Sequence, residues 1–170
     1  MIETERFEKM GNYLKNLIEI EKFPDAKSKK ILDIGSGDGF GLRVIKFLGG
    51  SGRGIEMDVK KLQKALAKGH SESEILFADA STIEEQFGPE SMDIITIFLA
   101  PLYDGRFIDI IHQAARILRK EGTLLITTPT MMEANLLEST MKETNIEGTV
   151  EWHPEFPCDK YVYIGKRKRK

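Results

Sequence analysis

The chain has 170 residues, 41% of them hydrophobic and 31% charged, which fits one compact soluble domain with a buried core and leaves no room for a second full domain. The formal charge is −2, but the last five residues are all basic, and the remainder carries 20 basic against 27 acidic side chains. That remainder has a net charge of −7, which argues against a broad nucleic-acid-binding face on the domain itself.

Cysteine content and hydropathy restrict the cellular setting. Cys158 is the only cysteine, so no intrachain disulfide can form and a reducing compartment is expected. The first 20 residues mix charges throughout and lack the basic start and apolar stretch of a signal peptide. No run approaches the roughly 20 apolar residues that span a bilayer. We therefore expect a cytoplasmic protein without a membrane span.

Taken in chain order, residues 1–22 predict an amphipathic helix that packs on the body of the protein. From residue 30 onward, apolar runs of strand length alternate with helical stretches, and the runs are apolar on both faces. This alternation is typical of a parallel sheet with helices on both faces, joined by right-handed crossovers. The expected strands are 30–34, 52–57, 74–78, 92–98 and 123–127.

The end of the chain breaks the alternation. A helix over 131–144 precedes two further extended segments, 149–152 and 161–165, with only seven residues between them. Seven residues suffice for a hairpin but not for a crossover, so these two strands should be antiparallel to each other. We therefore predict one α/β domain over 1–170, a doubly wound, seven-stranded, mostly parallel sheet with an antiparallel last pair. The basic tail, 166–170, is expected to be a solvated end.

A glycine-rich turn follows the first expected strand, in the order Asp33-Ile-Gly-Ser-Gly-Asp-Gly39. In a doubly wound sheet such a turn lies at the carboxyl edge, where ligands bind, and glycines let the backbone approach a ligand closely. A nicotinamide dinucleotide also uses such a turn, but its fingerprint needs glycine at position 40, where this chain has Phe40. Moreover, the carboxylate of Asp33 suits an ammonium group better than a pyrophosphate.

With these landmarks the sequence resembles the class I S-adenosylmethionine-dependent methyltransferases, whose first motif is an acidic residue followed by G-x-G-x-G. Glu56 lies 23 positions after Asp33 and corresponds to the family's acid that holds both ribose hydroxyls. Asp79 resembles the acid that accepts from the adenine amino group, although it is also a good N-cap for the next helix. Asp93 matches the residue that opens the fourth strand, and LRKEGTLLI resembles the turn into the fifth.

The resemblance implies S-adenosylmethionine as cofactor, S-adenosylhomocysteine as product, and in-line methyl transfer that needs no metal. Phe98, Tyr103 and Asp104 are the candidate residues at the reaction zone, and Asp104 or His112 could serve as a general base if the acceptor requires one. The three histidines show no metal-ligand spacing. The cofactor-binding residues implied are Asp33, Gly35, Ser36, Gly37, Asp38, Gly39, Glu56, Met57, Asp79, Ala80 and Phe98.

The segment that follows the fourth expected strand bears on the class of methyl acceptor. The pattern around Asp93 resembles the branch that methylates small molecules and quinone precursors, and Ala100-Pro101-Leu102-Tyr103 stands where many amino-group methyltransferases have N-P-P-Y. Two alternatives stay open. One is methylation of RNA or protein, aided by the basic tail. The other is a non-catalytic cofactor-binding subunit that activates a partner. A second copy, a partner chain or a large acceptor could close an otherwise open site.

Overall fold

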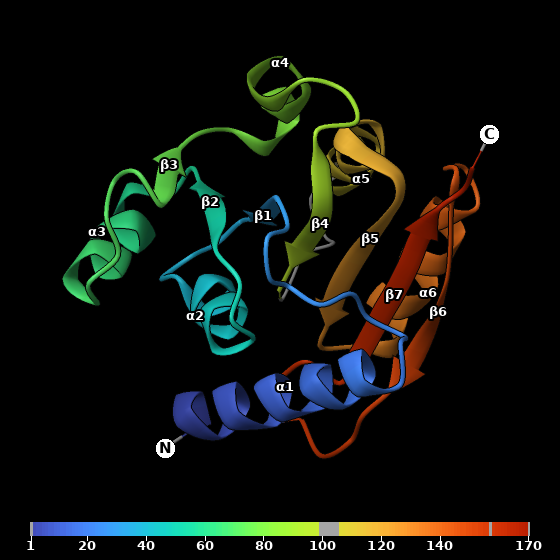
Figure 1. Cartoon of the computed structure of the whole chain (residues 1–170), viewed down its shortest axis with the longest axis horizontal. Coiled ribbons are helices and arrows are strands. Elements are labelled where there is room, and N and C mark those ends of the chain that lie inside the picture. The colour runs from blue at the N-terminus through green and yellow to red at the C-terminus, as the bar shows by residue number, and fades with distance from the viewer. Residues whose placement is uncertain (1, 99–105, 157, 170) are drawn as a thin grey trace.

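The computed structural model describes residues 2–98, 106–156 and 158–169 (Figure 1). Within these ranges, no helix is long and apolar enough to cross a membrane. The strands are β1 (Ile31–Ile34), β2 (Gly52–Glu56), β3 (Ile75–Phe77), β4 (Met92–Ile97), β5 (Leu118–Thr128), β6 (Ile146–Trp152) and β7 (Tyr161–Arg167). The helices are α1 (Ile2–Glu19), α2 (Phe40–Phe47), α3 (Val59–Ala67), the 3₁₀ turn η1 (Ala80–Thr82), α4 (Ile83–Phe87), α5 (Arg106–Ile117) and α6 (Met131–Met141).

The strands form one seven-stranded sheet in the order β3-β2-β1-β4-β5-β7-β6. Neighbours from β3 to β5 are parallel, whereas β7 is antiparallel to both β5 and β6. The predicted doubly wound fold with an antiparallel ending is therefore confirmed. The direction of winding reverses between β1 and β4, which places the topological switch point, and hence the expected ligand site, at the carboxyl ends of these strands.

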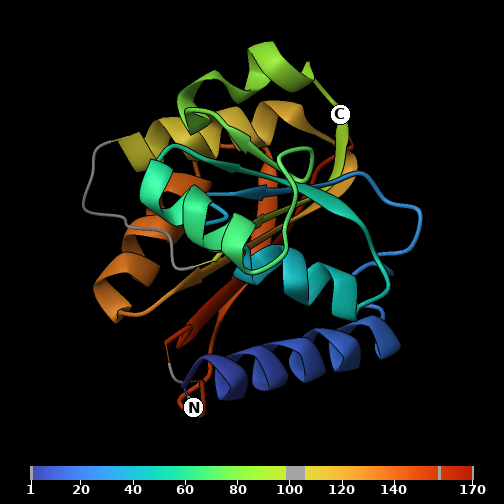
Figure 2. The ribbon, with the colours of Figure 1, turned by 90° about the vertical axis from the view of Figure 1, so that its left-hand side faces the viewer.

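Two layers of helices cover the sheet (Figure 2). Side chains of α1, α2 and α3 pack into the core on one face, and those of α4, α5 and α6 into the core on the other. Strand β5 supplies both cores, since Leu124 and Ile126 point to the α5 side and Leu125 to the α2 side. This explains why residues 124–126 of the strand are apolar without alternation.

Helix α1 packs as its amphipathic pattern predicts. Met10, Leu14 and Leu17 are all at most 5% exposed and lie against α2 and the sheet. In Figure 1, α1 runs along the edge of the molecule from α2 towards the end of β5 and the start of β7. The helix therefore crosses from the parallel part of the sheet to the antiparallel part.

Strand β5 begins at Leu118 rather than at residue 123. Leu118 pairs with Met92 of β4, after which the register shifts before Ile94 pairs with Thr123. Glu121, within the shifted stretch, has a positive φ of 62°. The sequence pattern identified only the regular part of the strand because this irregular stretch is polar.

The solvated tail predicted over 166–170 begins two residues later, because Lys166 and Arg167 are part of a strand while Lys168 and Arg169 are exposed. Lys166 and Arg167 belong to β7, where Lys166 pairs with both β5 and β6 and Arg167 pairs with β6. The Arg167 guanidinium donates hydrogen bonds to the backbone carbonyls of Arg116, near the end of α5, and of Leu118, the first residue of β5. Beyond the strand, two more basic side chains form ion pairs with acidic ones. The final hairpin is longer than its apolar residues indicate, since β6 starts at Ile146 rather than at residue 149.

Candidate functional site

A cavity of about 650 Å³ opens at the carboxyl ends of β1, β2 and β4. Its wall contains the last residues of these strands and the turns that follow them. Most of the predicted cofactor-binding residues lie in this wall, so the fold brings together side chains that are far apart in the sequence. They are Asp33, Gly35, Ser36, Gly37, Asp38, Glu56, Met57, Asp79, Ala80 and Phe98.

The glycine-rich turn presents bare backbone to the cavity. Gly35, Gly37 and Gly39 have φ values of 67°, 58° and 88°, a region that residues with a Cβ rarely adopt. Ser36 ties the turn to β2, because its N–H donates to the carbonyl of Ile55 at 2.9 Å and its hydroxyl donates to the same oxygen at 3.2 Å. The turn is therefore held on one side and open on the other.

Asp33 places a buried carboxylate under this turn. Its side chain is 1% exposed, and Oδ1 accepts a hydrogen bond from the Thr96 hydroxyl at 2.7 Å. Oδ2 is buried too, and it accepts no hydrogen bond from the residues that the structure describes. A Cβ on Gly41 would overlap with Oδ2, so glycine at that position leaves room for the carboxylate. The unused acceptor costs folding free energy until a donor reaches it.

The ionisation of Asp33 reflects this setting. Burial raises the pKa of Asp33 to about 7, although the hydrogen bond from Thr96 and the positive charge of Arg6 lower it. The negative charge of Glu56 raises it further. A cation placed beside Oδ2 would therefore be strongly favoured, because it would stabilise the charged form of a carboxylate that the protein alone leaves poorly compensated.

Glu56 ends β2 on the opposite side of the turn and is 6% exposed. Its Oε2 accepts the N–H of Gly37 and its Oε1 accepts the N–H of Asp58, both at 2.8 Å. These two bonds fix the carboxylate at the cavity wall. Each carboxylate oxygen retains a further lone pair, so Glu56 can still accept from two hydroxyl groups of a ligand.

Asp79 follows β3 and caps η1, because its side chain accepts the N–H of Ser81 at 2.9 Å. The backbone hydrogen bond from Ser81 lowers the pKa of Asp79. The N-cap interpretation left open by the sequence is thus correct, and the residue lines the cavity as well. Met57, which is 48% exposed, and Ala80 flank the same part of the wall.

An aromatic pair forms the wall on the other side of the turn. Phe98, directly after β4, packs edge-on against Phe40 at the start of α2, with ring centroids 5.4 Å apart. The guanidinium of Arg6, from α1, lies 3.6 Å from the centroid of the Phe40 ring. All three side chains line the cavity. Helix α1 therefore contributes a cation to a site otherwise built from the parallel strands.

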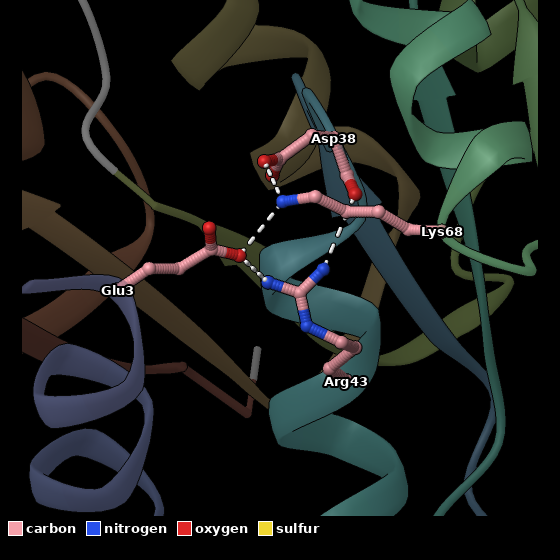
Figure 3. A network of polar contacts seen from close by, with 4 residues as sticks. All are labelled: Glu3, Asp38, Arg43 and Lys68. Atoms are coloured by element: carbon pink, nitrogen blue, oxygen red, sulfur yellow. Dashed lines mark hydrogen bonds and ion pairs between the residues drawn. The ribbon is translucent and has the colours of Figure 1, made fainter. Parts of the chain in front are cut away.

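Four charged side chains tie the first turn of α1 to the glycine turn (Figure 3). The Lys68 Nζ lies 2.5 Å from Oδ2 of Asp38 and 2.8 Å from Oε1 of Glu3. Arg43 pairs with the same Glu3 oxygen and donates to the backbone carbonyl of Asp38 at 3.3 Å. Burial alone would raise the pKa of Asp38, but Lys68 and Arg43 lower it below its ordinary value. This network holds α1 beside the cavity.

Two of the predicted residues lie outside the cavity wall, and two lie outside the described residues. Gly39 does not line the cavity but caps α2 and backs onto His70, whose Nε2 would overlap with a Cβ at that position. His112 lies on α5 with its Nε2 3.9 Å from Glu143 and takes no part in the cavity wall, which removes the reason to consider it as a base. Tyr103 and Asp104 lie outside the described residues.

Arg6 is a site residue that was not predicted from the sequence, where it is one of several charged residues in the first helix. A signal was present, since Arg6 falls on the same helical stripe as Met10, Leu14 and Leu17. A charged residue on an otherwise buried stripe requires a partner or a ligand. Also missed were Phe40, considered only as the residue that breaks a dinucleotide fingerprint, and Gly41, which makes room for Asp33.

The chain belongs to the methyltransferase domain family: the family model described as "Methyltransferase domain" matches residues 25–163. This range covers every strand of the sheet except the end of β7. The predicted class I methyltransferase, an enzyme class that uses S-adenosylmethionine as methyl donor, is therefore confirmed, while its small-molecule branch stays a prediction. The sequence matches none of the curated proteins.

Solved structures give the same fold. A SAM-dependent methyltransferase from Archaeoglobus fulgidus superposes with a TM-score of 0.72 at 14% identity, covering 94% of each chain. A methyltransferase from Haloferax volcanii, solved in a complex with the Trm112 methyltransferase activator, has a TM-score of 0.72 at 15% identity and covers 100% of this chain and 99% of its own. One from Methanococcus maripaludis reaches 0.73 at 14% identity, covering 94% and 85%. At these identities the similarity shows the fold.

Proposed function

We propose that this methyltransferase acts on a small or medium-sized acceptor and holds its cofactor in the cavity at the carboxyl ends of β1, β2 and β4. One observation carries the proposal: the buried Asp33 carboxylate has an oxygen that no described residue contacts by a hydrogen bond, beside a turn of open backbone. An ammonium group would supply the missing donor, and a pair of hydroxyls would suit Glu56. S-adenosylmethionine carries both groups, so the residues present fit it.

Each wall residue then has a distinct task. Asp33 would bind the ammonium group, Glu56 would accept from both ribose hydroxyls, and Asp79 would accept from the adenine amino group. Met57 and Ala80 offer apolar surface for the adenine ring. The backbone of the glycine turn would lie against the amino-acid end of the cofactor.

When bound, S-adenosylmethionine supplies a methyl group on a sulfonium, which is already an excellent leaving group. The chain therefore needs chiefly to align the acceptor and exclude water. Phe98 and Phe40 form an apolar wall next to the turn, and an aromatic face also favours a nearby cation. If the acceptor is a hydroxyl or an acidic carbon, Asp104 is the proposed base.

The size and lining of the cavity favour a small acceptor. Its volume of about 650 Å³ falls within the range of roughly 300–1,000 Å³ that holds drug-sized ligands. Beyond the acidic cofactor wall, its lining includes Phe98, Phe107 and Ile110, which are apolar. The basic residue Arg167 contacts the start of β5, at the amino ends of the parallel strands, whereas the cavity opens at their carboxyl ends. The basic end of the chain is badly placed to guide an RNA into the cavity.

Ligand binding and turnover test this proposal separately. Calorimetry should register S-adenosylhomocysteine binding, and Glu56→Gln should weaken it by about tenfold or more, because a charged acceptor is lost. Glu121→Gln, in the first part of β5 at the amino ends of the parallel strands, is the matched control and should bind normally. Stronger binding of NAD than of S-adenosylhomocysteine would overturn the assignment. Methyl transfer to a pool of small hydroxyl, amine and quinol acceptors, but not to RNA, is the result expected for the acceptor class.

A second candidate is a methyltransferase that needs a partner chain. The relative from Haloferax volcanii, which this chain matches over its whole length, was solved with an activator. In addition, β3 is an edge strand of the sheet, and its Phe77 is 62% exposed. In that case the isolated chain should bind S-adenosylhomocysteine yet turn over no acceptor until a partner is added. Turnover by the isolated chain would exclude this candidate.

A further inference from the structure

Arg6 and Asp159 form an ion pair that is almost completely removed from solvent. The Nε and Nη2 groups of Arg6 donate to the two carboxylate oxygens of Asp159, at 2.5 and 3.0 Å. The side chain of Asp159 is 0% exposed and that of Arg6 is 13% exposed. Stability alone explains such a pair poorly, because the desolvation of both charges offsets much of their attraction. The pair therefore needs another reason.

Asp159 is built into the antiparallel part of the sheet. It lies shortly before β7, and the hydroxyl of Thr127, near the end of β5, donates to its Oδ1. A carboxylate held in this way can fix the plane of a guanidinium through two parallel hydrogen bonds. Arg6 is held from a second side by the ring of Phe40. Its position is thus determined by β5, by the β6–β7 connection and by α2 together.

The guanidinium keeps donors for a ligand. It has five N–H groups, and the bonds to Asp159 use two of them. Among the described residues, no other hydrogen bond of Arg6 is found, and the side chain lines the same cavity as Asp33. Arg6 is close enough for its charge to lower the pKa of Asp33. The lining of one cavity thus contains both a carboxylate oxygen and guanidinium N–H groups that have no hydrogen-bond partner among the described residues.

We propose that Arg6 binds the carboxylate at the amino-acid end of the cofactor and that Asp159 is the positioning residue that holds Arg6 for this contact. An amino-acid group carries one ammonium and one carboxylate, and Asp33 and Arg6 match these two charges. The inference rests on the proposed function, since it adds a contact in the same cavity. It also gives the antiparallel part of the sheet an indirect role in cofactor recognition, because Asp159 acts through Arg6.

The test compares two ligands that differ only at the group in question. S-adenosylhomocysteine carries the amino-acid end, whereas 5′-methylthioadenosine keeps the nucleoside and the thioether but lacks that end. The double variant Arg6→Gln/Asp159→Asn removes both charges, so that no unpaired charge is buried. Calorimetry should show S-adenosylhomocysteine binding weakened about 10- to 100-fold, as expected for the loss of a charge-assisted hydrogen bond. Binding of 5′-methylthioadenosine should change less than about twofold.

Two single variants refine the result. Asp159→Asn should lower only the affinity for S-adenosylhomocysteine, by less than the double variant does, because Arg6 keeps its charge but loses its fixed orientation. Lys9→Gln removes a cation one turn further along α1, where Lys9 contacts the backbone of Glu155, and should leave both affinities unchanged. Circular dichroism verifies that each variant is folded.

The outcomes separate this inference from the one on which it rests. If the wild-type chain binds neither ligand, the proposed function fails. If it binds both and the double variant weakens them equally, or weakens neither, Arg6 does not recognise the carboxylate. If the double variant weakens the binding of neither ligand, Arg6 is left to bind a carboxylate on the acceptor instead of the cofactor. That result would overturn the inference.

Discussion

Each half of the sheet contains a buried carboxylate, and the two carboxylates differ in their hydrogen-bond partners. In the parallel half, strands of three to six residues end in open turns, and Asp33 has an oxygen with no partner among the described residues. In the antiparallel half, β5, β7 and β6 have 11, 7 and 7 residues, and both oxygens of Asp159 accept hydrogen bonds from Arg6. The parallel half thus leaves a carboxylate oxygen for a ligand to bind. The antiparallel half satisfies both oxygens of its carboxylate and holds Arg6 in the cavity wall.

Asp33→Asn should produce the largest change and should separate stability from binding. The pKa of Asp33 is raised from 3.8 to about 7, so between these values the folded state binds a proton that the unfolded state has lost. The stability of the unliganded protein should therefore fall as pH rises from about 4 to about 7 and level off above that. At pH 8, ionisation of the buried Asp33 carboxyl costs roughly 4 kcal/mol of folding stability, and Asp33→Asn should recover part of this loss. Urea unfolding at pH 5 to 8 measures this slope.

The same substitution should cost the protein its cofactor. An amide in place of the carboxylate supplies no negative charge to an ammonium group, so S-adenosylhomocysteine affinity at pH 8 should fall by about 100-fold or more. In the wild type, affinity should rise from pH 6 to pH 8 as Asp33 ionises, and the variant should lose this dependence. A variant that is less stable at pH 8 than the wild type, yet binds normally, would show that Asp33 is structural.

Gly39→Ala tests how tightly the glycine turn packs against His70. Gly39 has a φ of 88°, and a Cβ there would overlap with Nε2 of the buried His70. Gly88 has a φ of 76° with no atom within 4 Å of the added Cβ, so Gly88→Ala carries the backbone strain alone. We expect about 1 kcal/mol of destabilisation for Gly88→Ala and about 3 kcal/mol for Gly39→Ala, measured by urea unfolding. Equal losses would mean that His70 moves aside freely.

Two truncations test the antiparallel half. A chain ending at Arg167 keeps all of β7, whereas one ending at Gly165 loses the residues that pair with Thr123, Ile146 and Glu147. The shorter chain should be less stable by about 2 kcal/mol, since ladder hydrogen bonds and the Arg167 contacts disappear. The longer one should lose only about 1 kcal/mol, because it loses exposed ion pairs and one backbone hydrogen bond, from Lys168 to Asn145. Similar unfolding midpoints for both chains would mean that residues 166 and 167 add no stability and belong to the solvated tail that the composition indicates.

The accuracy of the sequence prediction follows the same division between the halves. The glycine turn, the acids at the strand ends and the alternation of strands and helices are local patterns, and each was readable from residue spacing. The extension of the last hairpin was not, because Lys166 and Arg167 are polar residues that join β7 through backbone pairing, Lys166 with β5 and β6 and Arg167 with β6. The contact between Arg6 and Asp159 joins residues 153 positions apart, and no local pattern encodes it.

The smallest expected effect concerns the charge network that joins α1 to the glycine turn. Glu3 is 53% exposed and Lys68 is 35% exposed, so water and salt screen their attraction. Exposed pairs contribute roughly 0.2–1 kcal/mol, which limits the loss of S-adenosylhomocysteine affinity in Glu3→Gln to about fivefold. The hydrogen bond from Lys68 lowers the pKa of Glu3, so Glu3 stays ionised and the effect should not vary between pH 6 and pH 8.

Salt dependence distinguishes this network from the buried Arg6–Asp159 pair. In about 0.5 M NaCl the difference between Glu3→Gln and the wild type should disappear, whereas the loss caused by Arg6→Gln/Asp159→Asn should persist, because salt does not reach a buried pair. Glu5→Gln is the matched control, since Glu5 pairs only with Lys9 of its own helix among the described residues. If Glu5→Gln weakens binding as much as Glu3→Gln does, the charge of α1 acts on the ligand at long range, and the network does not hold the helix against the turn.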